Sequence, residues 1–523
     1  MRNQFFIIVF LFAAFLFSTG CEEYTSPDQG IIVEGIPKDT TILVNTVFDL
    51  ELKVKAGDGL DLFRIAVNGI DVQSRKFSGE TNFITTFSYT PNSLEAGKQI
   101  IIVVFARDSD GDIFDSKILL NIIDGVKPIA ENPPTIIDNP LVSQILVVKE
   151  DICTDQTWYS GNTYILDGRI AVKCGAKLTI QKGVIVKANL PIGEKISSLI
   201  ITPGAKIDAQ GTESQPIIFT SIKDLIQPGT IEPKLNEGFF DESWWDEGRK
   251  PDYQGQYGLW GGLLILGKAR GSFPGSVSEY QIVGIPESDQ KGKYGGNDDL
   301  DNSGILRNIS IRYAGNKLFS NQNISALTLG AVGLGTIIEN IEIYQCAADG
   351  IRIFGGTVNL KNILTALNAD DGISIDQGWN GTLENFLMLG NGDNSFEIDG
   401  PKGSYYNGNH SILNGAVMSW TSKSLIFFEE GSNTDISNTY FFDLDEDLKF
   451  GINMLPTRYS PKISGIEVSL INKNSSISHL FDGWNEDQVK LVRPEQRTVG
   501  PDLSGFENWS WVLSFFIVNG FSL

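Results

Sequence analysis

Short motifs that recur 22 residues apart restrict the fold of this chain more than any other feature. Asp-Gly pairs at 349–350 and 371–372 precede "IRI" and "ISI", and Asp393 precedes "SFEI". Asn340 and Asn362 keep the same spacing. A repeat of this length that holds several short strands indicates a solenoid, because one unit buries its apolar side only by stacking on its neighbours.

Among solenoids, the composition favours strands. There are 55 Gly against 4 Met, a leucine-rich consensus is absent, and helical repeats need longer units. We therefore predict an all-β chain whose main domain is a right-handed parallel β-helix over 144–445. The aperiodic stretches 222–259 and 270–304 are expected to be loops on its flank. Residues 446–523 predict a C-terminal β cap over the open end of the solenoid, with a final strand in 511–523.

The region before the solenoid has a different pattern. Residues 35–124 read as short alternating strands between turn residues, which predicts an Ig-like β-sandwich. A Pro-rich linker at 125–143 follows it. In the loop "RDSDGD", Asp108, Asp110 and Asp112 alternate as calcium ligands do, but an Asp-Gly hairpin turn explains them equally simply and is the favoured interpretation.

The N-terminus predicts export. Residues 5–17 form an apolar run of 13 residues, which suits a signal peptide and is too short to span a bilayer. The "STGC" that ends at Cys21 resembles the lipobox of bacterial lipoproteins. That resemblance implies a signal peptide at 1–20, a lipid on Cys21, a tether at 21–34, and a place at the outer membrane or cell surface. The alternative is ordinary secretion with cleavage elsewhere, and no later segment is apolar enough to cross a membrane.

Charge and cysteine usage limit the partners. Sixty-four acids against 41 bases give a net charge of −23, which repels nucleic acid and favours cations, or polymers bridged by cations, unless the charge serves solubility alone. With only two histidines, a three-histidine zinc site is excluded. Cys153 and Cys174 lie one repeat apart, so a disulfide between adjacent rungs is allowed. Cys346 lies in an apolar run and is expected to be buried.

Several longer stretches carry a family resemblance. "GAKIDAQGTESQPIIFTS", "LWGGLLILGKA", "YGGNDDLDNSGILRNISIRYAG" and "DGIRIFGGTVNLKNIL" together are similar to a family of secreted bacterial lipoproteins with a pectin-lyase-like parallel β-helix. The resemblance covers about residues 141–437. It supports the fold and the location more than an activity, because the family's function is not established.

The repeated acids have two interpretations. Turn chemistry alone explains Asp followed by Gly at a recurring corner, and this is the favoured interpretation. The functional alternative is a stripe of carboxylates on stacked rungs that share a cation or a proton. If the chain is an enzyme, the candidates are Asp370, Asp371, Asp393 and Arg352.

Two further groups are candidate sites. Asp299, Asp301 and Ser303, followed by Gly304, match the first half of a calcium loop, with a solvated acidic loop as the alternative. The aromatic side chains of one flank loop could stack on sugar rings or pack against the solenoid wall. They are Trp244, Trp245, Tyr253, Tyr257 and Trp260.

The leading functional prediction is non-catalytic binding or adhesion, to a polysaccharide, with calcium as the only cofactor. The alternatives are a carbohydrate-active lyase or hydrolase, and a structural subunit that binds an envelope protein. Hydrolases of this fold carry "DD" and "NTD" motifs, but here Asp370-Asp371 precedes the "NTD" at 433–435, the reverse of their order. Fold analogy alone is a weak warrant for catalysis.

Overall fold

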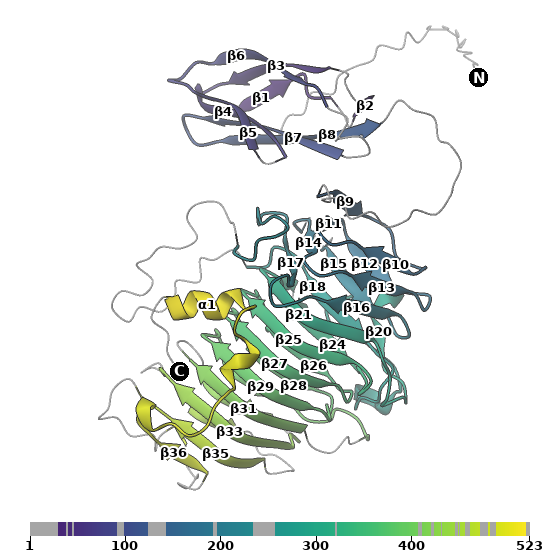
Figure 1. The fold of residues 1–523 in the computed structure, drawn as a ribbon, viewed down its shortest axis with the longest axis vertical. Helices are drawn as coiled ribbons and strands as arrows, with labels where there is room; N and C mark the ends of the chain where they lie inside the picture. Colours follow the sequence, from purple (N-terminus) through teal and green to yellow (C-terminus); the bar gives the residue numbers. More distant parts are fainter. Residues whose placement is uncertain are drawn as a thin grey trace, which may run out of the picture. The chain divides into compact units, whose positions relative to one another are not determined.

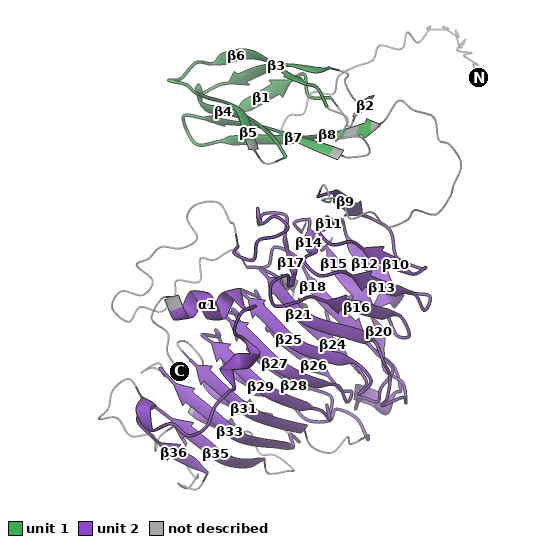
Figure 2. Ribbon diagram, in the orientation of Figure 1, with its two compact units in different colours: residues 1–138 green, residues 139–523 purple. Residues whose placement is uncertain are grey.

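The structure is a computed structural model with two compact units, residues 1–138 and 139–523 (Figure 2). The residues that it describes are 30–37, 40–43, 47–68, 70–91, 99–123, 143–191, 196–233, 257–318, 322–405, 410–419, 423–429, 431–444, 448, 450–454, 461–470, 480–481 and 488–518. Cys21, the signal peptide, residues 22–29 of the predicted tether and residues 125–142 of the predicted Pro-rich linker lie outside them, whereas Ile31–Glu34, predicted as tether, form a strand of the sandwich. No helix within these ranges is long and apolar enough to span a membrane.

Unit 1 is a β-sandwich, as predicted. Buried and exposed residues alternate strictly along β3, and the buried side chains of both sheets form one core. One sheet has the order β1-β3-β6 and the other β2-β8-β7-β4-β5. The strands are β1 (Ile31–Glu34), β2 (Thr40–Leu43), β3 (Phe48–Ala56), β4 (Leu60–Val67), β5 (Ile70–Lys76), β6 (Asn82–Tyr89), β7 (Gln99–Asp108) and β8 (Ile113–Ile123).

Unit 2 is a parallel β-helix with three faces (Figure 1). The first face begins with β10 (Gln156–Trp158), β13 (Lys177–Ile180) and β16 (Lys206–Gln210). The second begins with β9 (Ile145–Val148), β11 (Thr163–Leu166), β14 (Ile185–Ala188) and β17 (Ile217–Ser221). Both continue in longer strands: β21 (Gly304–Arg312), β25 (Ile337–Tyr344), β27 (Asn359–Ala366), β29 (Thr382–Leu389), β31 (His410–Met418), β33 (Thr434–Phe442), β35 (Lys462–Val468) and the short β36 (Val489–Leu491).

The third face is a sheet of nine strands. They are β12 (Arg169–Val172), β15 (Ser198–Ile201), β18 (Gly262–Leu266), β24 (Leu327–Gly330), β26 (Ile351–Phe354), β28 (Ile373–Asp376), β30 (Asn394–Ile398), β32 (Ser424–Phe428) and β34 (Phe450–Met454). Their inward side chains, such as Ile373 and Ile375, lie in the solenoid core as the alternation predicted.

An asparagine ladder explains why the long strands bend. The first half of β21 pairs with β16 and its second half with β17, and Asn308 stands between the halves at φ 51°. The equivalent Asn340, Asn362 and Asn385 also have positive φ, and each donates from its Nδ2 to the Oδ1 of the asparagine one rung earlier. Asparagine tolerates this left-handed conformation, so the repeated residue both bends each rung and bonds it to the next.

The cysteine prediction is also confirmed. Cys153 and Cys174 form a disulfide with a Cα–Cα distance of 5.1 Å, at the N-terminal end of the solenoid, and Cys346 is buried. The bond joins two adjacent rungs, since β10 pairs with β13 in parallel register.

The insertion at 270–304 lies on the flank, as expected. Its antiparallel pair β19 (Tyr280–Gln281) and β20 (Lys293–Tyr294), with Phe273, packs on the outward side chains of β18 such as Leu264. It covers the early part of the nine-stranded sheet and reaches later rungs, where the backbone N of Ser272 donates to the carbonyl of Gln377 after β28 and the backbone N of Lys402 donates to the carbonyl of Ser272. A second antiparallel pair, β22 (Asn316–Leu318) with β23 (Gln322–Ile324), follows β21.

The C-terminal segment differs from the prediction. β34, β35 and β36 extend the solenoid sheets beyond residue 445, and the apolar stretch expected to be a strand is α1 (Trp511–Val518). Figure 1 shows this segment, in yellow, returning from β36 along the side of the solenoid. Because α1 lies on the outer surface of a sheet and not at its edge, its backbone has no strand to pair with and satisfies its own hydrogen bonds as a helix.

Candidate functional site

The candidate site lies on the outer side of the nine-stranded sheet, over β26, β28, β30 and β32. Residues that precede or face outward from these strands stack in register, because each strand pairs in parallel with the next. We call the carboxylates on this surface the acidic face. They are Asp349, Asp370, Asp371, Asp376, Glu397, Asp399 and Glu429.

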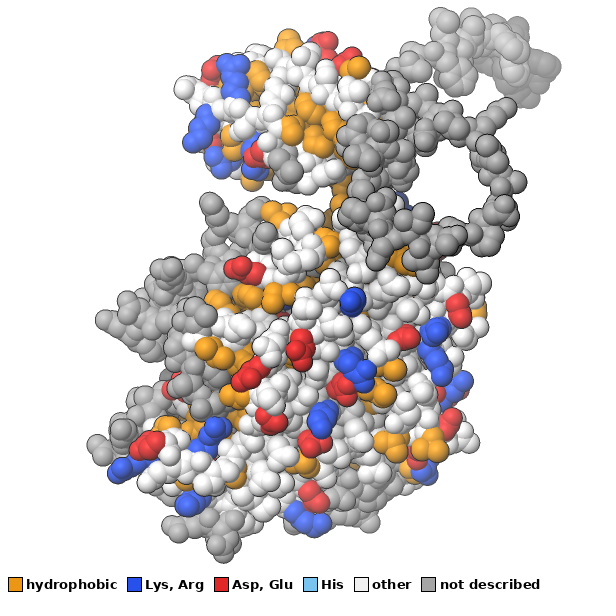
Figure 3. All heavy atoms as spheres, in the orientation of Figure 1, with side chains coloured by type: hydrophobic (Ala, Val, Ile, Leu, Met, Phe, Trp, Pro, Cys, Tyr) orange, Lys and Arg blue, Asp and Glu red, His pale blue; other side chains and the backbone are white. Residues whose placement is uncertain are grey.

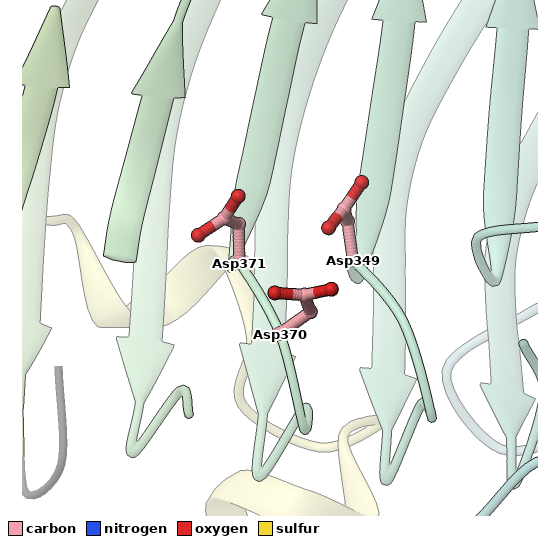
Figure 4. Close-up of side chains that lie close together, drawn as sticks. All are labelled: Asp349, Asp370 and Asp371. Atoms are coloured by element: carbon pink, nitrogen blue, oxygen red, sulfur yellow. The ribbon is translucent and has the colours of Figure 1, made fainter. Parts of the chain in front are cut away.

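Three of these carboxylates form a cluster. Asp349 stands at the corner before β26, and Asp370 and Asp371 stand at the corner before β28 (Figure 4). One oxygen from each lies within 4.8 Å of the others. Among the described residues this is the group of three or more acids, histidines or cysteines that could jointly hold a metal ion. Of the acids in the alternative interpretation, the carboxylate stripe, these three lie together and Asp393 is not among them.

The cluster is electrostatically unfavourable without a cation. Burial raises the pKa of Asp349 to about 6, with Asp370 and Glu397 adding to the effect and Arg352 opposing it. Burial and then the charge of Asp349 also raise the pKa of Asp371 well above its ordinary value. Carboxyl groups in this state either keep a proton or bind a metal ion.

The turn interpretation holds for part of the same cluster. Asp371 Oδ1 accepts hydrogen bonds from the backbone N of Asn394 at 2.7 Å and from its side chain at 2.9 Å. One oxygen of Asp371 therefore organises the corner of the next rung.

Arg352 is the cation nearest to the cluster. Its Nη1 lies 3.6 Å from Asp349 Oδ2, and its guanidinium lies 5.0 Å from the centre of the Phe354 ring. Burial lowers the pKa of Arg352, but the neighbouring carboxylates, led by Asp349, outweigh it and raise the pKa above its usual value. Arg352 is thus held in its charged form.

A second acidic group lies toward the other end of the same strands. Burial, followed by the neighbouring Asp399, raises the pKa of Asp376 to about 6 and that of Glu429 to about 7. Lys402 pairs with Asp399 and lies 3.9 Å from Glu429. One lysine thus lies among three carboxylates.

Glu429 and Lys402 were missed at the sequence level. The rung between β30 and β32 is longer than the two before it, with Lys423 pairing 30 residues back to Asp393. The 22-residue count therefore fails to align Glu429 with Asp399. An apolar strand that ends in "EE" was the available signal.

The other predicted acids lie apart from the cluster. Asp393 pairs with Lys423 at 2.8 Å. Asp299 accepts from the backbone N and the Nε of Arg270, whereas Asp301 accepts from Ser303 Oγ at 3.1 Å. The Asp299 carboxylate is thus already neutralised by a guanidinium, and calcium binding by Asp299, Asp301 and Ser303 stays a prediction.

The aromatic prediction is corrected at one position. Trp260 is fully buried and donates from Nε1 to the carbonyl of Arg312 at 2.8 Å, because it is a core residue just before β18. It cannot present a ring to a sugar. Tyr257 is half-buried, and Trp244, Trp245 and Tyr253 lie outside the described residues.

His410 offers no surface acid or base. It is buried, its Nε2 lies 2.9 Å from Thr434 Oγ1, and burial lowers its pKa to about 4. A histidine in this state is a neutral structural residue at physiological pH.

Fold and site together define a parallel β-helix with carboxylates stacked on one outer face. The model of the pectate-lyase like beta helix domain matches residues 150–231 and 252–458, which is more than half of the chain. The chain belongs to this family. No curated protein matches it.

Some solved structures resemble a small part of the chain. Fibronectin(III)-like modules of Clostridium thermocellum CbhA share 13% identity over 20% of this chain and 53% of that one, about half its length, with a TM-score of 0.15. The CARDB domain of Pyrococcus furiosus PF1109 shares 16% identity over 17% of this chain and 90% of the domain, with a TM-score of 0.14. A crystal structure of the same domain with di-metal ions gives 16% over 18% and 94%, also with a TM-score of 0.14. Likenesses this weak carry no argument.

Proposed function

We propose that this chain is a non-catalytic surface protein that binds a polysaccharide on its acidic face through a calcium ion. The observation that carries the proposal is the cluster of Asp349, Asp370 and Asp371, whose oxygens lie within 4.8 Å of one another. Calcium takes oxygen ligands and suits such a group. A bound ion that keeps open coordination positions can accept sugar hydroxyl or carboxylate oxygens.

The surface beside the cluster suits a sugar chain. Phe427 is in register with Glu397, and because its neighbours Ile426 and Phe428 lie in the core, its half-buried ring faces outward. An aromatic ring next to carboxylates offers stacking together with hydrogen bonds, which is the usual chemistry of carbohydrate recognition. The parallel register places Arg352, Ser374, Glu397 and Phe427 in one row across four rungs.

The absence of an available base near the cluster argues against a lyase there. A lyase needs a base beside its cation, and Arg352 is held charged by the acids around it. Lys423, which feels the charges of Asp370 and Asp371, pairs with Asp393, and Lys402 pairs with Asp399. None of the three is poised to abstract a proton.

The test is affinity electrophoresis of the chain in gels that contain different polysaccharides, with calcium or with a chelator. We expect calcium-dependent retardation without loss of polymer staining. Asp371→Asn should weaken the retardation by at least tenfold, because it removes one charged ligand and leaves the corner hydrogen bonds. Asp393→Asn is the matched control, since Asp393 pairs with Lys423 outside the cluster. Equal retardation of the two variants would count against the proposal.

The second candidate is a carbohydrate-active enzyme, and it rests on a different observation. Glu429 has a pKa raised to about 7 and is only half-buried, which is the state of a general acid. A cleared zone in the same gels, abolished by Glu429→Gln but kept by Asp371→Asn, would favour this enzyme over the binding protein.

The lipid anchor belongs to the same proposal. The sequence before Cys21 supports attachment of the chain to the outer membrane or cell surface, where polysaccharides are accessible. Metabolic labelling with a fatty-acid analogue should label the wild-type chain and not Cys21→Ser. Equal labelling of the two would reject this part. If no polysaccharide retards the chain, the remaining alternative is a structural subunit that binds an envelope protein. Co-purification of such a protein is its test.

A further inference from the structure

Three segments of unit 1 meet at one end of the sandwich. They are the residue before β1, the turn between β3 and β4, and the end of β7. The backbone N of Gly57 donates to the carbonyl of Gly30 at 3.1 Å, and the backbone N of Ser109 donates to the carbonyl of Gly59 at 2.8 Å. Leu60 is in register with Asp108. These bonds bring Asp58 and Asp108 to the same corner.

Asp108 has one carboxylate oxygen in use and one left over. Its Oδ1 accepts from the backbone N of Asp110 at 3.2 Å and of Asp112 at 2.8 Å, which is the hairpin-turn role that the sequence suggested. The residue is 1% exposed, and its Oδ2 is buried with no hydrogen-bond partner among the described residues. A buried carboxylate oxygen without a donor or a cation is unfavourable, so this oxygen requires a partner.

Gly30 leaves open space beside that oxygen. A β-carbon on Gly30 would lie 3.8 Å from Asp108 Oδ2 and 3.5 Å from Asp58 Oδ2. The two carboxylate oxygens therefore flank the position that a side chain would fill. Neither Asp58 nor Asp108 forms an ion pair with any residue of the described ranges, and Arg107, next to Asp108, pairs with Asp61.

We propose that this corner of the sandwich is a calcium site, with Asp108 Oδ2 and Asp58 as its ligands. The ligand atoms are carboxylate oxygens with no histidine or cysteine beside them, which selects a hard divalent cation over zinc. Backbone carbonyls of the same turns and water complete the coordination. The site belongs to unit 1 and is independent of the acidic face of unit 2.

Two variants test the site without removing the turn. Gly30→Ala places its methyl group at ordinary contact distances from both oxygens, so the fold tolerates it, but it fills the space of the ion. Asp108→Asn keeps an oxygen for the two backbone donors of the turn and replaces the unused oxygen with an amide. Asp115→Asn, on an exposed position of β8, removes the same charge elsewhere and is the control.

Calcium is titrated calorimetrically into the whole chain carrying Asp370→Asn, which weakens the cluster of unit 2. We expect a remaining site with a Kd of about 0.1–1 mM, in the range of extracellular calcium modules. Gly30→Ala and Asp108→Asn should each weaken it at least tenfold with an unchanged circular dichroism spectrum, and Asp115→Asn should not. The proposal is overturned if the Asp370→Asn chain binds no calcium, or if Gly30→Ala binds it as tightly as its parent. Neither result bears on polysaccharide retention by the acidic face.

Discussion

Two outer faces of the β-helix differ in how their carboxylates are paired and covered. On the second face, Glu342 is 1% exposed and accepts hydrogen bonds from Ser310 Oγ at 2.6 Å, Ser510 Oγ at 2.7 Å and the backbone N of Val512 at 2.9 Å. Arg312, equally buried, lies 3.7 Å away. On the acidic face, Arg352 lies 3.6 Å from Asp349, and Lys402 pairs with Asp399 and lies 3.9 Å from Glu429.

The two faces differ because the C-terminal segment covers only one of them. The C-terminal segment lies over the second face, where Trp511 contacts Tyr344 edge to face and Phe516 joins the same apolar cluster. Its two hydrogen bonds to Glu342 fix the start of α1. On the third face no α-helix of the described residues packs in this way, and the insertion at 270–304 reaches only the ends of the later strands, at Gln377 and Lys402. The same stacked register thus gives a docking surface for the chain itself on one side and a charged surface on the other, in which Asp349 and Asp371 are only 4% and 3% exposed.

Mixed charge marks the solenoid surface elsewhere. Figure 3 shows acidic and basic side chains interspersed over the visible face of unit 2, in keeping with pairs such as Arg307–Glu339 and Lys361–Glu384. Exposed pairs of this kind contribute about 0–1 kcal/mol each.

The largest expected effect is a loss of stability on the second face, which the C-terminal segment covers. Glu342→Gln leaves the charge of Arg312 buried without a counter-charge, so we expect a loss of about 3–5 kcal/mol in the free energy of unfolding. Denaturant unfolding and limited proteolysis of the C-terminal segment measure it. Glu339→Gln, which removes an exposed partner of Arg307, is the control and should cost under about 1 kcal/mol. A small effect of Glu342→Gln would show that α1 docks by apolar contacts alone.

The next effect is a pH dependence of stability that originates on the acidic face. The pKa values of Asp349 and Asp376, about 6, and of Glu429, about 7, lie above those of an unfolded chain. Groups raised in this way stabilise the fold below pH 4 and lose that contribution as the pH rises through 6 to 7. In the presence of a chelator, we expect the chain to be less stable at pH 8 than at pH 5, by on the order of 1–3 kcal/mol.

Calcium should reverse this loss at pH 8, because it replaces the protons. Thermal unfolding at the two pH values, with and without calcium, checks both statements. A stability that rises between pH 5 and pH 8 without calcium would mean that these carboxylates are stabilised as anions.

A smaller effect is expected at the ladder that bends both faces. Asn362→Ala removes a side-chain hydrogen bond to Asn340 and one from Asn385, and it places a β-carbon residue without a polar side chain at φ 53°. We expect a loss of about 1–2 kcal/mol. Asn362→Gly relieves the backbone strain and should cost less than Asn362→Ala in the same denaturation series. Reversal of that order would assign the cost to the side chain alone.

The smallest expected effect on stability is that of Asp371→Asn, which contrasts with that of Glu342→Gln. Asp371→Asn should change the free energy of unfolding by less than about 1 kcal/mol, because it removes an unfavourable charge and keeps an acceptor for Asn394. The same substitution should abolish most of the calcium-dependent polymer retention. A large destabilisation would place Asp371 with Glu342 as a structural residue.

The 22-residue repeat was enough to predict much of the β-helix from the sequence. The 22-residue spacing placed Asp349 and Asp371 on neighbouring rungs and aligned Asn340 with Asn362, because every rung of that length lands on the same register. The disulfide followed from the same spacing. The sequence did not predict the position of Glu429, because its rung is longer. It did not predict α1, because nothing local distinguishes an apolar strand from a short apolar helix.

Burial was the other limit on prediction. Trp260 and Tyr257 lie three residues apart in one aromatic stretch, yet only the fold shows that Trp260 belongs to the core. The unused oxygen of Asp108 was equally invisible, since the turn motif accounts for the acids without reference to Gly30.

The disulfide of the first rungs has a mechanical consequence. Each rung bonds only to its neighbours, so tension applied from the N-terminal side peels a solenoid one strand at a time. Cys153–Cys174 ties the rung of β10 to that of β13, so the first of these strands cannot be pulled away without loading the second. A chain tethered by its N-terminus and held by a polymer on its side would carry the load through unit 1 and β9 before this covalent clamp stops the peeling of the solenoid.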